Sequence, residues 1–282
     1  MTGTLFVVAT PIGNLEDITL RALRILREST LILAEDTRRT AGLLAHYGIA
    51  TRTESYHGHS EHSRLPALMD RLSRGERLAL VSDAGMPLVS DPGAPLVSAA
   101  RAAGHRVEVI PGPSAVTTAL VSTGWSVDSF VYLGFPPRQA SQKRSWLRGV
   151  AAEPRMVVFF EAPHRMADTL AACQELFPER RLAVARELTK VHEELSIGTA
   201  AELSSRLHPF RGEFTVVVEP VSAEAGGEHA PITDDQLWRE FCSLTADAGT
   251  DRRAAVTLLG RRYGKPSREI YAALERAKAA ET

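Results

Sequence analysis

The chain has 282 residues, of which 44% are hydrophobic and 24% are charged, and its formal net charge at pH 7 is −1. This length suits two domains, and the composition is that of an ordinary globular protein with a sizeable core. A nearly neutral balance excludes attraction of nucleic acid by the field of the whole protein, so any such binding needs local basic patches. The only cysteines, Cys173 and Cys242, form no CxxC pair, which excludes a disulfide framework and a cysteine zinc site.

The N-terminus leads directly into a predicted strand and carries no basic leader segment. No apolar run along the chain is long enough to cross a bilayer. Both observations favour a cytoplasmic protein.

Short apolar runs alternate with amphipathic segments over roughly the first 220 residues. These runs predict strands at 5–9, 31–34, 78–81, 107–110, 130–133, 156–160, 182–185 and 214–219. Helical patterns occupy most of the intervals between them. Such alternation is typical of an α/β fold with largely parallel sheets.

Two breaks divide this pattern. Pro111-Gly112-Pro113 predicts a boundary between two α/β lobes, 1–112 and 113–221. The polar segment 222–230 is typical of a linker. Apolar residues then recur at helical spacing over 231–282, where the basic residues outnumber the acidic ones from Arg252 on. We therefore expect two α/β lobes followed by a small helical module.

Two glycine- and proline-rich loops follow predicted strands, at 10–14 and 82–93. Open α/β sheets bind their ligands at the carboxyl ends of parallel strands, so both loops are candidates for contact with a small polar cofactor. In the first loop Gly13 would let the backbone approach a ligand and Pro11 would stiffen the turn, although the GxGxxG dinucleotide fingerprint is absent. An ordinary turn is the alternative.

The second loop holds two aspartates. Asp83 is the better ligand candidate, since a carboxylate at a strand end suits a ribose hydroxyl or an amino group, whereas Asp91 before Pro92 is interpreted as a helix cap. The segment 111–115 also follows a strand and opens a helix, and it could face the same cleft, act as a rigid hinge, or do both.

Charged residues gather after other strands, at 35–39, 161–165 and 186–190. Their positions favour a functional role, while local ion pairing is the alternative. His57, His59 and His62 could in principle bind a metal, but no further ligands accompany them, so we predict no metal site. The stretch 135–148 carries four basic residues and no acidic one, which makes it a candidate for phosphate contacts or simply a solvated surface.

Six of these segments, taken together in order and spacing, resemble the ribosomal RNA small subunit methyltransferase I family of the tetrapyrrole methylase superfamily. They read VATPIGNL (8–15), AEDTR (34–38), VSDAGMP (81–87), PGPSA (111–115), EAPHR (161–165) and ARELTK (185–190). The resemblance covers roughly residues 4–220 and, less sharply, the helical tail. In the wider superfamily the second loop usually reads Gly-Asp-Pro, so Ser82-Asp83-Ala84 argues against a tetrapyrrole substrate rather than against the cofactor.

The resemblance implies two α/β lobes with S-adenosylmethionine folded in the cleft between them, and a homodimer. It implies 2′-O-methylation of a cytidine ribose in 16S rRNA, at the decoding centre of the small ribosomal subunit. A tetrapyrrole C-methyltransferase on the same scaffold and a non-catalytic RNA-binding assembly factor are the alternatives. The tail is expected to help RNA engagement, or else to pack on the body or on the dimer partner.

The resemblance also implies the residues that contact the cofactor. They are Pro11, Gly13, Asp83, Ala84, Gly85, Met86, Ser114, Ala115, Phe160 and Thr215. Methyl transfer to a ribose hydroxyl benefits from a general base. The candidates for this base at predicted strand ends are His59, Glu61, Glu161, Glu187 and Lys190. Arg38, Arg165 and Arg186 are expected to hold phosphates. The sequence does not choose among the candidate bases.

Overall fold

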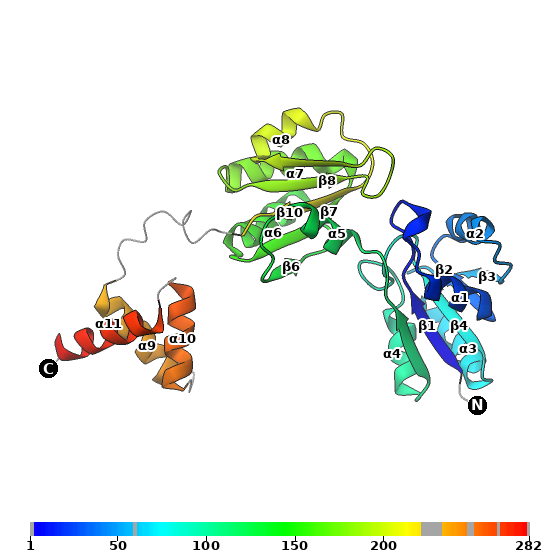
Figure 1. The fold of residues 1–282 in the computed structure, drawn as a ribbon, viewed down its shortest axis with the longest axis horizontal. Coiled ribbons are helices and arrows are strands. Elements are labelled where there is room, and N and C mark those ends of the chain that lie inside the picture. Colours follow the sequence, from blue (N-terminus) through cyan, green and yellow to red (C-terminus); the bar gives the residue numbers. More distant parts are fainter. Residues whose placement is uncertain (1–2, 59–60, 221–232, 247–250, 264–265, 281–282) are drawn as a thin grey trace. The chain divides into compact units, whose positions relative to one another are not determined.

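The computed structural model describes residues 3–58, 61–220, 233–246, 251–263 and 266–280. The chain forms two compact units, which meet in the sequence at Pro220 and Val221. Within the described residues the first unit contains two five-stranded sheets and the second contains three helices (Figure 1). Each unit is described separately below.

The first sheet is entirely parallel, in the order β3-β2-β4-β1-β5. Its strands are β1 (Thr4–Val8), β2 (Leu31–Ala34), β3 (Thr53–Ser55), β4 (Arg77–Val81) and β5 (Arg106–Ile110). Two helices cover one face, α1 (Leu20–Glu28) and α2 (Thr37–His46), and two cover the other, α3 (Glu61–Ser73) and α4 (Ala94–Ala102). Because both faces are covered, the central strands are continuous apolar runs, as the sequence predicted.

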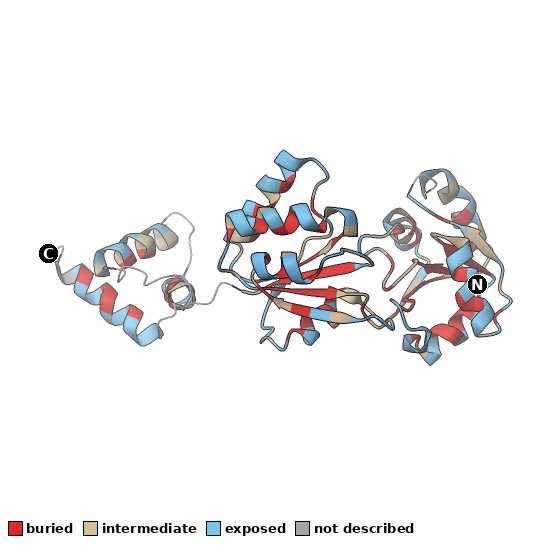
Figure 2. Ribbon diagram, turned by 90° about the horizontal axis from the view of Figure 1, so that it is seen from above, coloured by how far each residue is buried: buried red, intermediate tan, exposed pale blue. Residues whose placement is uncertain are grey.

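The second sheet is mixed, in the order β6-β7-β10-β8-β9. Its strands are β6 (Phe130–Tyr132), β7 (Met156–Glu161), β8 (Leu182–Arg186), β9 (Glu194–Gly198) and β10 (Phe214–Val218). Helix α5 (Ala115–Ser122) packs on one face, and three helices pack on the other, α6 (Ala140–Ala152), α7 (Pro163–Leu176) and α8 (Ala200–Arg206). Figure 2 shows the buried central strands and the buried sides of the helices in red.

The expectation of largely parallel sheets is wrong for this second lobe. Only β6 and β7 pair in parallel, while β10 runs antiparallel to both of its neighbours and β9 forms an antiparallel pair with β8. Every residue of β10 is buried, so its side chains show the same continuous apolar run that a parallel strand would have. Apolar periodicity therefore reported burial but not strand direction.

The second unit contains α9 (Asp234–Ala246), α10 (Arg252–Arg262) and α11 (Ser267–Ala280). Leu237, Phe241, Val256, Leu259 and Ile270 form its core, each less than 5% exposed. The apolar stripes seen in the sequence are thus buried against one another, and the predicted helical character of the tail is confirmed. The predicted linker, 222–230, lies outside the described residues.

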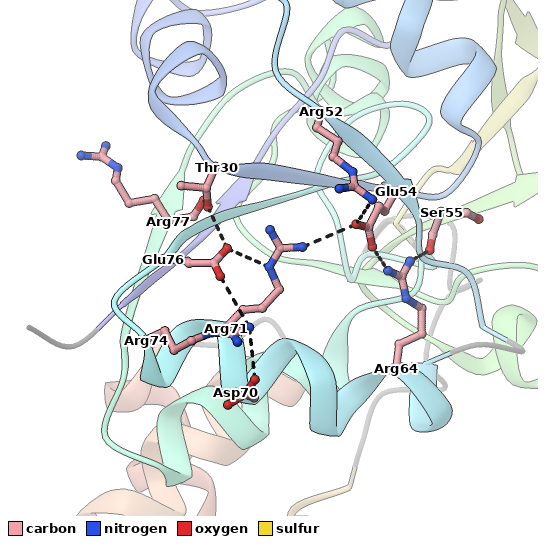
Figure 3. Close-up of polar contacts among 10 residues, drawn as sticks. All are labelled: Thr30, Arg52, Glu54, Ser55, Arg64, Asp70, Arg71, Arg74, Glu76 and Arg77. Carbon is pink, nitrogen blue, oxygen red and sulfur yellow. Dashed lines mark hydrogen bonds and ion pairs between the residues drawn. The ribbon is translucent and has the colours of Figure 1, made fainter.

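A network of charged side chains fastens the short edge strand β3 to helix α3 (Figure 3). Glu54 on β3 pairs with Arg64, with Arg52 at 3.2 Å and with Arg71 at 3.4 Å. Arg71 also pairs with Glu76 at 2.7 Å. The Glu54 side chain is only 22% exposed, so these charges are partly shielded from water.

Replacing Glu54 with glutamine should lower the free energy of unfolding by about 1–2 kcal/mol, because two half-buried guanidinium groups lose their shared counter-charge. Urea unfolding of the full chain measures the change. Asp70→Asn is the matched control, since the Asp70 carboxylate on α3 is 64% exposed and makes an i,i+4 pair with Arg74, just after the end of that helix. The control should change the stability by less than about 0.5 kcal/mol, and equal effects of the two substitutions would contradict the prediction.

Candidate functional site

A cavity of about 320 Å³ lies where loops of both lobes meet. The first lobe contributes the loops after β1 and β4, and the second contributes the ends of β7 and β8 and the start of β10. The antiparallel direction of β10 is what brings its first residues to this edge, with Thr215 in register with Phe160 of β7. The cavity is in the size range of small-molecule and cofactor sites.

The structure brings the ten predicted cofactor residues together. Eight line this cavity: Asp83, Ala84, Gly85, Met86, Ser114, Ala115, Phe160 and Thr215. Pro11 and Gly13 line an adjoining cavity of about 380 Å³, which shares Ile12, Asp83, Ala84 and Glu213 with the first.

Backbone hydrogen bonds fix the two first-lobe loops against each other. The Thr10 N–H donates to the Gly85 carbonyl at 2.9 Å, and the Gly85 N–H donates to the Thr10 carbonyl at 3.0 Å. The Thr10 hydroxyl also donates to the Ser82 carbonyl at 3.1 Å. Gly85 has φ 77°, a left-handed conformation that glycine adopts without strain. This wall of the cavity is therefore preformed.

Gly13 is required for a different reason from the one the sequence suggested. A Cβ atom on it would lie 2.6 Å from Lys190 Cγ and 2.7 Å from the Leu188 carbonyl oxygen. The neighbouring Asn14 N–H donates to Thr189 Oγ1 at 2.9 Å. The glycine thus lets the loop after β1 approach the loop after β8, which joins the two lobes beside the cavity.

Glu161, a candidate base, lines the cavity, but its carboxylate is engaged by other groups of the protein. Its side chain is fully buried, and its oxygens accept hydrogen bonds from the Ala162 N–H at 2.8 Å and from the Thr169 hydroxyl at 2.6 Å. Arg165 lies 3.4 Å away and donates to the carbonyls of Pro136 and Pro137 at 2.6 and 2.8 Å. These contacts make Glu161 and Arg165 anchors of the loop after β6 rather than groups free to contact substrate.

Glu187 and Lys190 belong to another local network of charged side chains. The Lys190 ammonium donates to Glu187 at 2.9 Å and to Glu213 at 3.0 Å. Burial by itself would lower the pKa of Lys190, but the hydrogen bonds to the two carboxylates raise it above the ordinary value. Lys190 therefore stays protonated near neutral pH and is a poor candidate for the base.

The remaining candidates also make contacts within the protein. Glu61 accepts a hydrogen bond from the Gly93 N–H at 2.5 Å, which holds the end of the 82–93 loop. Arg38 is 90% exposed and pairs with Asp36, and Arg186 pairs with Glu194 at 3.2 Å. In the described part of the chain, none of Glu61, Arg38 and Arg186 lines the two cavities. His59 lies outside the described residues.

Asp91 is the functional candidate that sequence reasoning missed. The interpretation of Asp91 as a helix cap is wrong, because α4 begins at Ala94 with Gly93 as its N-cap and without a side-chain cap. Asp91 instead lines the cofactor-sized cavity. Burial, followed by the charges of nearby Glu35 and Asp83, raises the pKa of Asp91 from its ordinary 3.8 to about 6.

The backbone around Asp91 is strained. Leu88 and Ser90 have φ values of 72° and 68°, which are uncommon for residues with a Cβ atom. The Ser90 and Tyr132 hydroxyls share a hydrogen bond of 2.6 Å, so the strained loop of the first lobe is attached to β6 of the second. The sequence signal for Asp91 was the presence of two aspartates after a buried strand. The proline that follows Asp91 led to its interpretation as a helix cap.

The second cavity contains a further residue that the sequence did not single out. Arg39, one position after the predicted Arg38, lines this cavity, and its guanidinium lies 3.7 Å from Asp83 Oδ2. Within the described ranges, no group of three or more His, Cys, Asp or Glu side chains is arranged to hold a metal ion. No helix in those ranges is long and apolar enough to cross a membrane.

Comparison with known proteins agrees with this geometry. Residues 4–204 match the family of Tetrapyrrole (Corrin/Porphyrin) Methylases. The Ribosomal RNA small subunit methyltransferase I of Halalkalibacterium halodurans is 40% identical over 277 residues, which cover 95% of this chain and 93% of the relative. The protein of the same name from Xylella fastidiosa is 48% identical over 237 residues, covering 82% and 86% of the two chains.

A solved structure shows the same fold. Uroporphyrin-III C-methyltransferase from Thermus thermophilus, complexed with S-adenosyl homocysteine, aligns with a TM-score of 0.55 at 18% identity, over 77% of this chain and 97% of that one. The α/β fold with two sheets and the resemblance noted in the sequence are both confirmed. The chain belongs to the tetrapyrrole methylase family and, within it, to the ribosomal RNA small subunit methyltransferase I proteins.

Proposed function

We propose that this protein transfers the methyl group of S-adenosylmethionine to the RNA of the small ribosomal subunit. The observation that carries the proposal is that five of the six sequence motifs line one preformed pair of cavities, in a chain up to 48% identical to ribosomal RNA small subunit methyltransferases I. The sixth, at 34–38, is held beside them by the Asp36 N–H, which donates to Asp83 at 2.9 Å. In its finer form, the acceptor is the 2′-hydroxyl of a cytidine in 16S rRNA, at the decoding centre.

The residues of the cavity fit the cofactor. Helix α5 begins at Ala115, and its N-cap Ser114 makes no side-chain cap hydrogen bond, so the first backbone N–H groups can receive the methionine carboxylate. The Asp83 carboxylate suits a ribose hydroxyl or the amino group, and Met86 and Phe160 offer apolar contact. Thr215, beside Phe160, is proposed to lie near the adenine.

When bound, S-adenosylmethionine would supply an electrophilic methyl group on a sulfonium for transfer to the acceptor oxygen. The task of the protein is to align that oxygen and to take up its proton. The candidate bases named from the sequence are hydrogen-bonded within the protein, apart from His59, which lies outside the described residues. Asp91 lines the cavity with a pKa near 6, so it is ionised but still basic at neutral pH, and we propose it as the proton acceptor.

Two other readings compete with this function. A tetrapyrrole C-methyltransferase is favoured by the shared fold, but solved structures of such enzymes that align at 15–22% identity indicate the fold alone. A non-catalytic assembly factor would need no intact cofactor site, yet all ten expected residues surround the two cavities. A titration with S-adenosylmethionine separates this last reading from both enzymes, since it predicts no binding.

The first experiment is transfer of labelled methyl from S-adenosylmethionine to small ribosomal subunits purified from a strain that lacks this protein. Nuclease mapping then locates the label. Label on a single cytidine ribose supports the reaction, the substrate and the cofactor together. Cofactor binding without label on the subunit would contradict the proposal and favour the tetrapyrrole reading.

The homodimer and the cytoplasmic location remain part of the proposal. Light scattering of the full chain measures its oligomeric state, and a mass of one chain would contradict the homodimer.

For the helical unit we propose a role in RNA engagement. Deletion of residues 229–282 should weaken binding to the small subunit and leave cofactor affinity unchanged, because the ten cofactor residues all lie in the first unit. Unchanged affinity for the subunit would rule this role out.

A further inference from the structure

A third cavity, of about 880 Å³, opens on the second lobe. It lies between the loop that follows β6, helix α6 and the first turn of α7. Phe135 and Ala162 line both this cavity and the cofactor-sized one, so the two are adjacent. The charged and titratable residues that line it are Arg138, Lys143, His164, Arg165 and Asp168.

Lys143 is the unusual member of this set. It is only 7% exposed although it projects from an amphipathic surface helix, and its ammonium makes a hydrogen bond of 3.4 Å to Thr169 Oγ1. Thr169 in turn donates to Glu161 at 2.6 Å. Among the described residues no carboxylate lies within 4 Å of the Lys143 ammonium, which has three N–H donors.

The charges beneath this cavity do not balance. Glu161 is a single buried carboxylate, and two cations depend on it, Arg165 at 3.4 Å and Lys143 through Thr169. The cluster therefore has a formal charge of +1 next to the cavity. A buried charge without a partner is costly, so an anion that enters the cavity and meets Lys143 is favoured.

The rim adds a further cation and an acid. Arg138, His164 and Asp168 are exposed side chains that line the cavity, and with His164 neutral their formal charges cancel, so the net charge at the site is the +1 of the buried cluster. Arg165 donates to the carbonyls of Pro136 and Pro137, which fixes the loop that carries Arg138 before any ligand arrives. The site is thus preorganised for an anion beside the place where the methyl group is transferred.

We propose that this cavity binds a phosphate group of the substrate RNA, next to the nucleotide whose ribose enters the cofactor cleft. Lys143 is the buried cation that meets the phosphate and Arg138 is the cation at the rim. Phosphate contacts of this kind set the register of a nucleic acid on a protein without reading its sequence. The inference rests on the proposed function, because only an RNA substrate places a phosphate chain beside that cleft.

The test measures the affinity of the full chain for unmethylated small ribosomal subunits as a function of potassium chloride concentration. Arg138→Gln and Lys143→Met are the two test variants. Each should weaken binding about 5–10-fold at physiological salt and reduce the salt slope by about 1, the change expected when one phosphate contact is lost. Cofactor affinity should stay unchanged, since neither residue lines the first two cavities in the described chain.

Arg144→Gln is the matched control. Arg144 lies on the same helix one position from Lys143, but its guanidinium pairs with Glu175 at 2.5 Å and it does not line the third cavity. The control should change subunit affinity less than about 2-fold. Since Arg138 is exposed, Arg138→Gln keeps the test decisive even if the buried Lys143→Met variant folds poorly.

The outcomes separate the two proposals. If the unmodified protein neither binds nor methylates the subunit, the proposed function and this inference both fail. If it methylates the subunit and Arg138→Gln behaves like the Arg144→Gln control, the inference alone is overturned. A third result also overturns it. In that case inorganic phosphate raises the melting temperature of the unmodified protein but not of Arg138→Gln, while subunit affinity is the same in all variants, because the site then binds a free anion.

Discussion

Replacement of Asp91 with asparagine should reduce methyl transfer about 100- to 10,000-fold, the range expected when a general base is lost. The same substitution should stabilise the fold at pH 8. In the folded protein burial raises the pKa of Asp91 to about 6, so its favourable contribution is complete below the ordinary value of 3.8 and is lost as the pH rises through about 6. At pH 8 the ionised carboxylate costs about 1 kcal/mol, after allowance for its partial exposure to water.

Two measurements check this prediction. Urea unfolding should show that Asp91→Asn is more stable than the unmodified protein at pH 8 and equal to it near pH 4. The kcat/KM of the unmodified enzyme should rise with pH through about 6. Loss of stability at pH 8, or turnover that survives the substitution, would contradict the role. A residue that only caps or braces the loop gives the opposite sign of the stability change.

The charged groups near Asp91 provide a second control on the dependence of kcat/KM on pH. Glu35 and Asp83 both raise the pKa of Asp91, and a hydrogen bond from Ser82 lowers it. Glu35 is the residue to change, because Asp83 is proposed to bind the cofactor. Glu35→Gln removes one negative charge and should move the rising limb of the pH profile to lower pH, with Asp91 and the cofactor residues intact. An unmoved limb would show that another group titrates there.

The sequence predicted the positions of the strands well because burial leaves a mark in residue type. All eight predicted strands are present, and each of their bounds differs from the observed one by at most one residue. The two that were missed are β3, whose three residues Thr53–Ser55 are polar, and β9, whose Leu195 is 37% exposed. Both are edge strands with few apolar residues, whereas the edge strands β5 and β6 carry more of them and were predicted.

The site could be predicted only in part for a related reason. The rule that ligands bind at strand ends, with the family resemblance, identified the residues around the cavities. It could not identify which charged groups are already hydrogen-bonded within the protein. Glu187 receives the N–H of Glu213, 26 residues further along, and Asp83 receives that of Asp36 across 47 residues. Such pairings depend on the folded arrangement. They engage, in contacts within the protein, side chains that the sequence offered as a base or as a cofactor ligand.

Replacement of Glu161 is the prediction with the second large effect. Its result distinguishes a residue that stabilises the fold from a general base. Glu161→Gln should lower the free energy of unfolding by about 3 kcal/mol, because the fully buried carboxylate that Lys143 and Arg165 share as a counter-charge is replaced by a neutral amide. Urea unfolding of the full chain measures the loss. Glu175→Gln is the control, since its carboxylate is 56% exposed and pairs with Arg144, and it should cost less than about 0.5 kcal/mol.

A double-mutant cycle shows whether the loss comes from the charge balance. In the Glu161→Gln background, Lys143→Met removes an ammonium that has lost its counter-charge, so it should be less destabilising than in the unmodified protein by about 1–2 kcal/mol. Additive effects would mean that Lys143 does not depend on Glu161. If Glu161→Gln instead abolished methyl transfer at full stability, Glu161 would be the base, and its contacts with Thr169 and Ala162 would serve to orient it. The expected combination is a large loss of stability with catalysis retained in the fraction that is folded, since Asp91 keeps its place in the cavity.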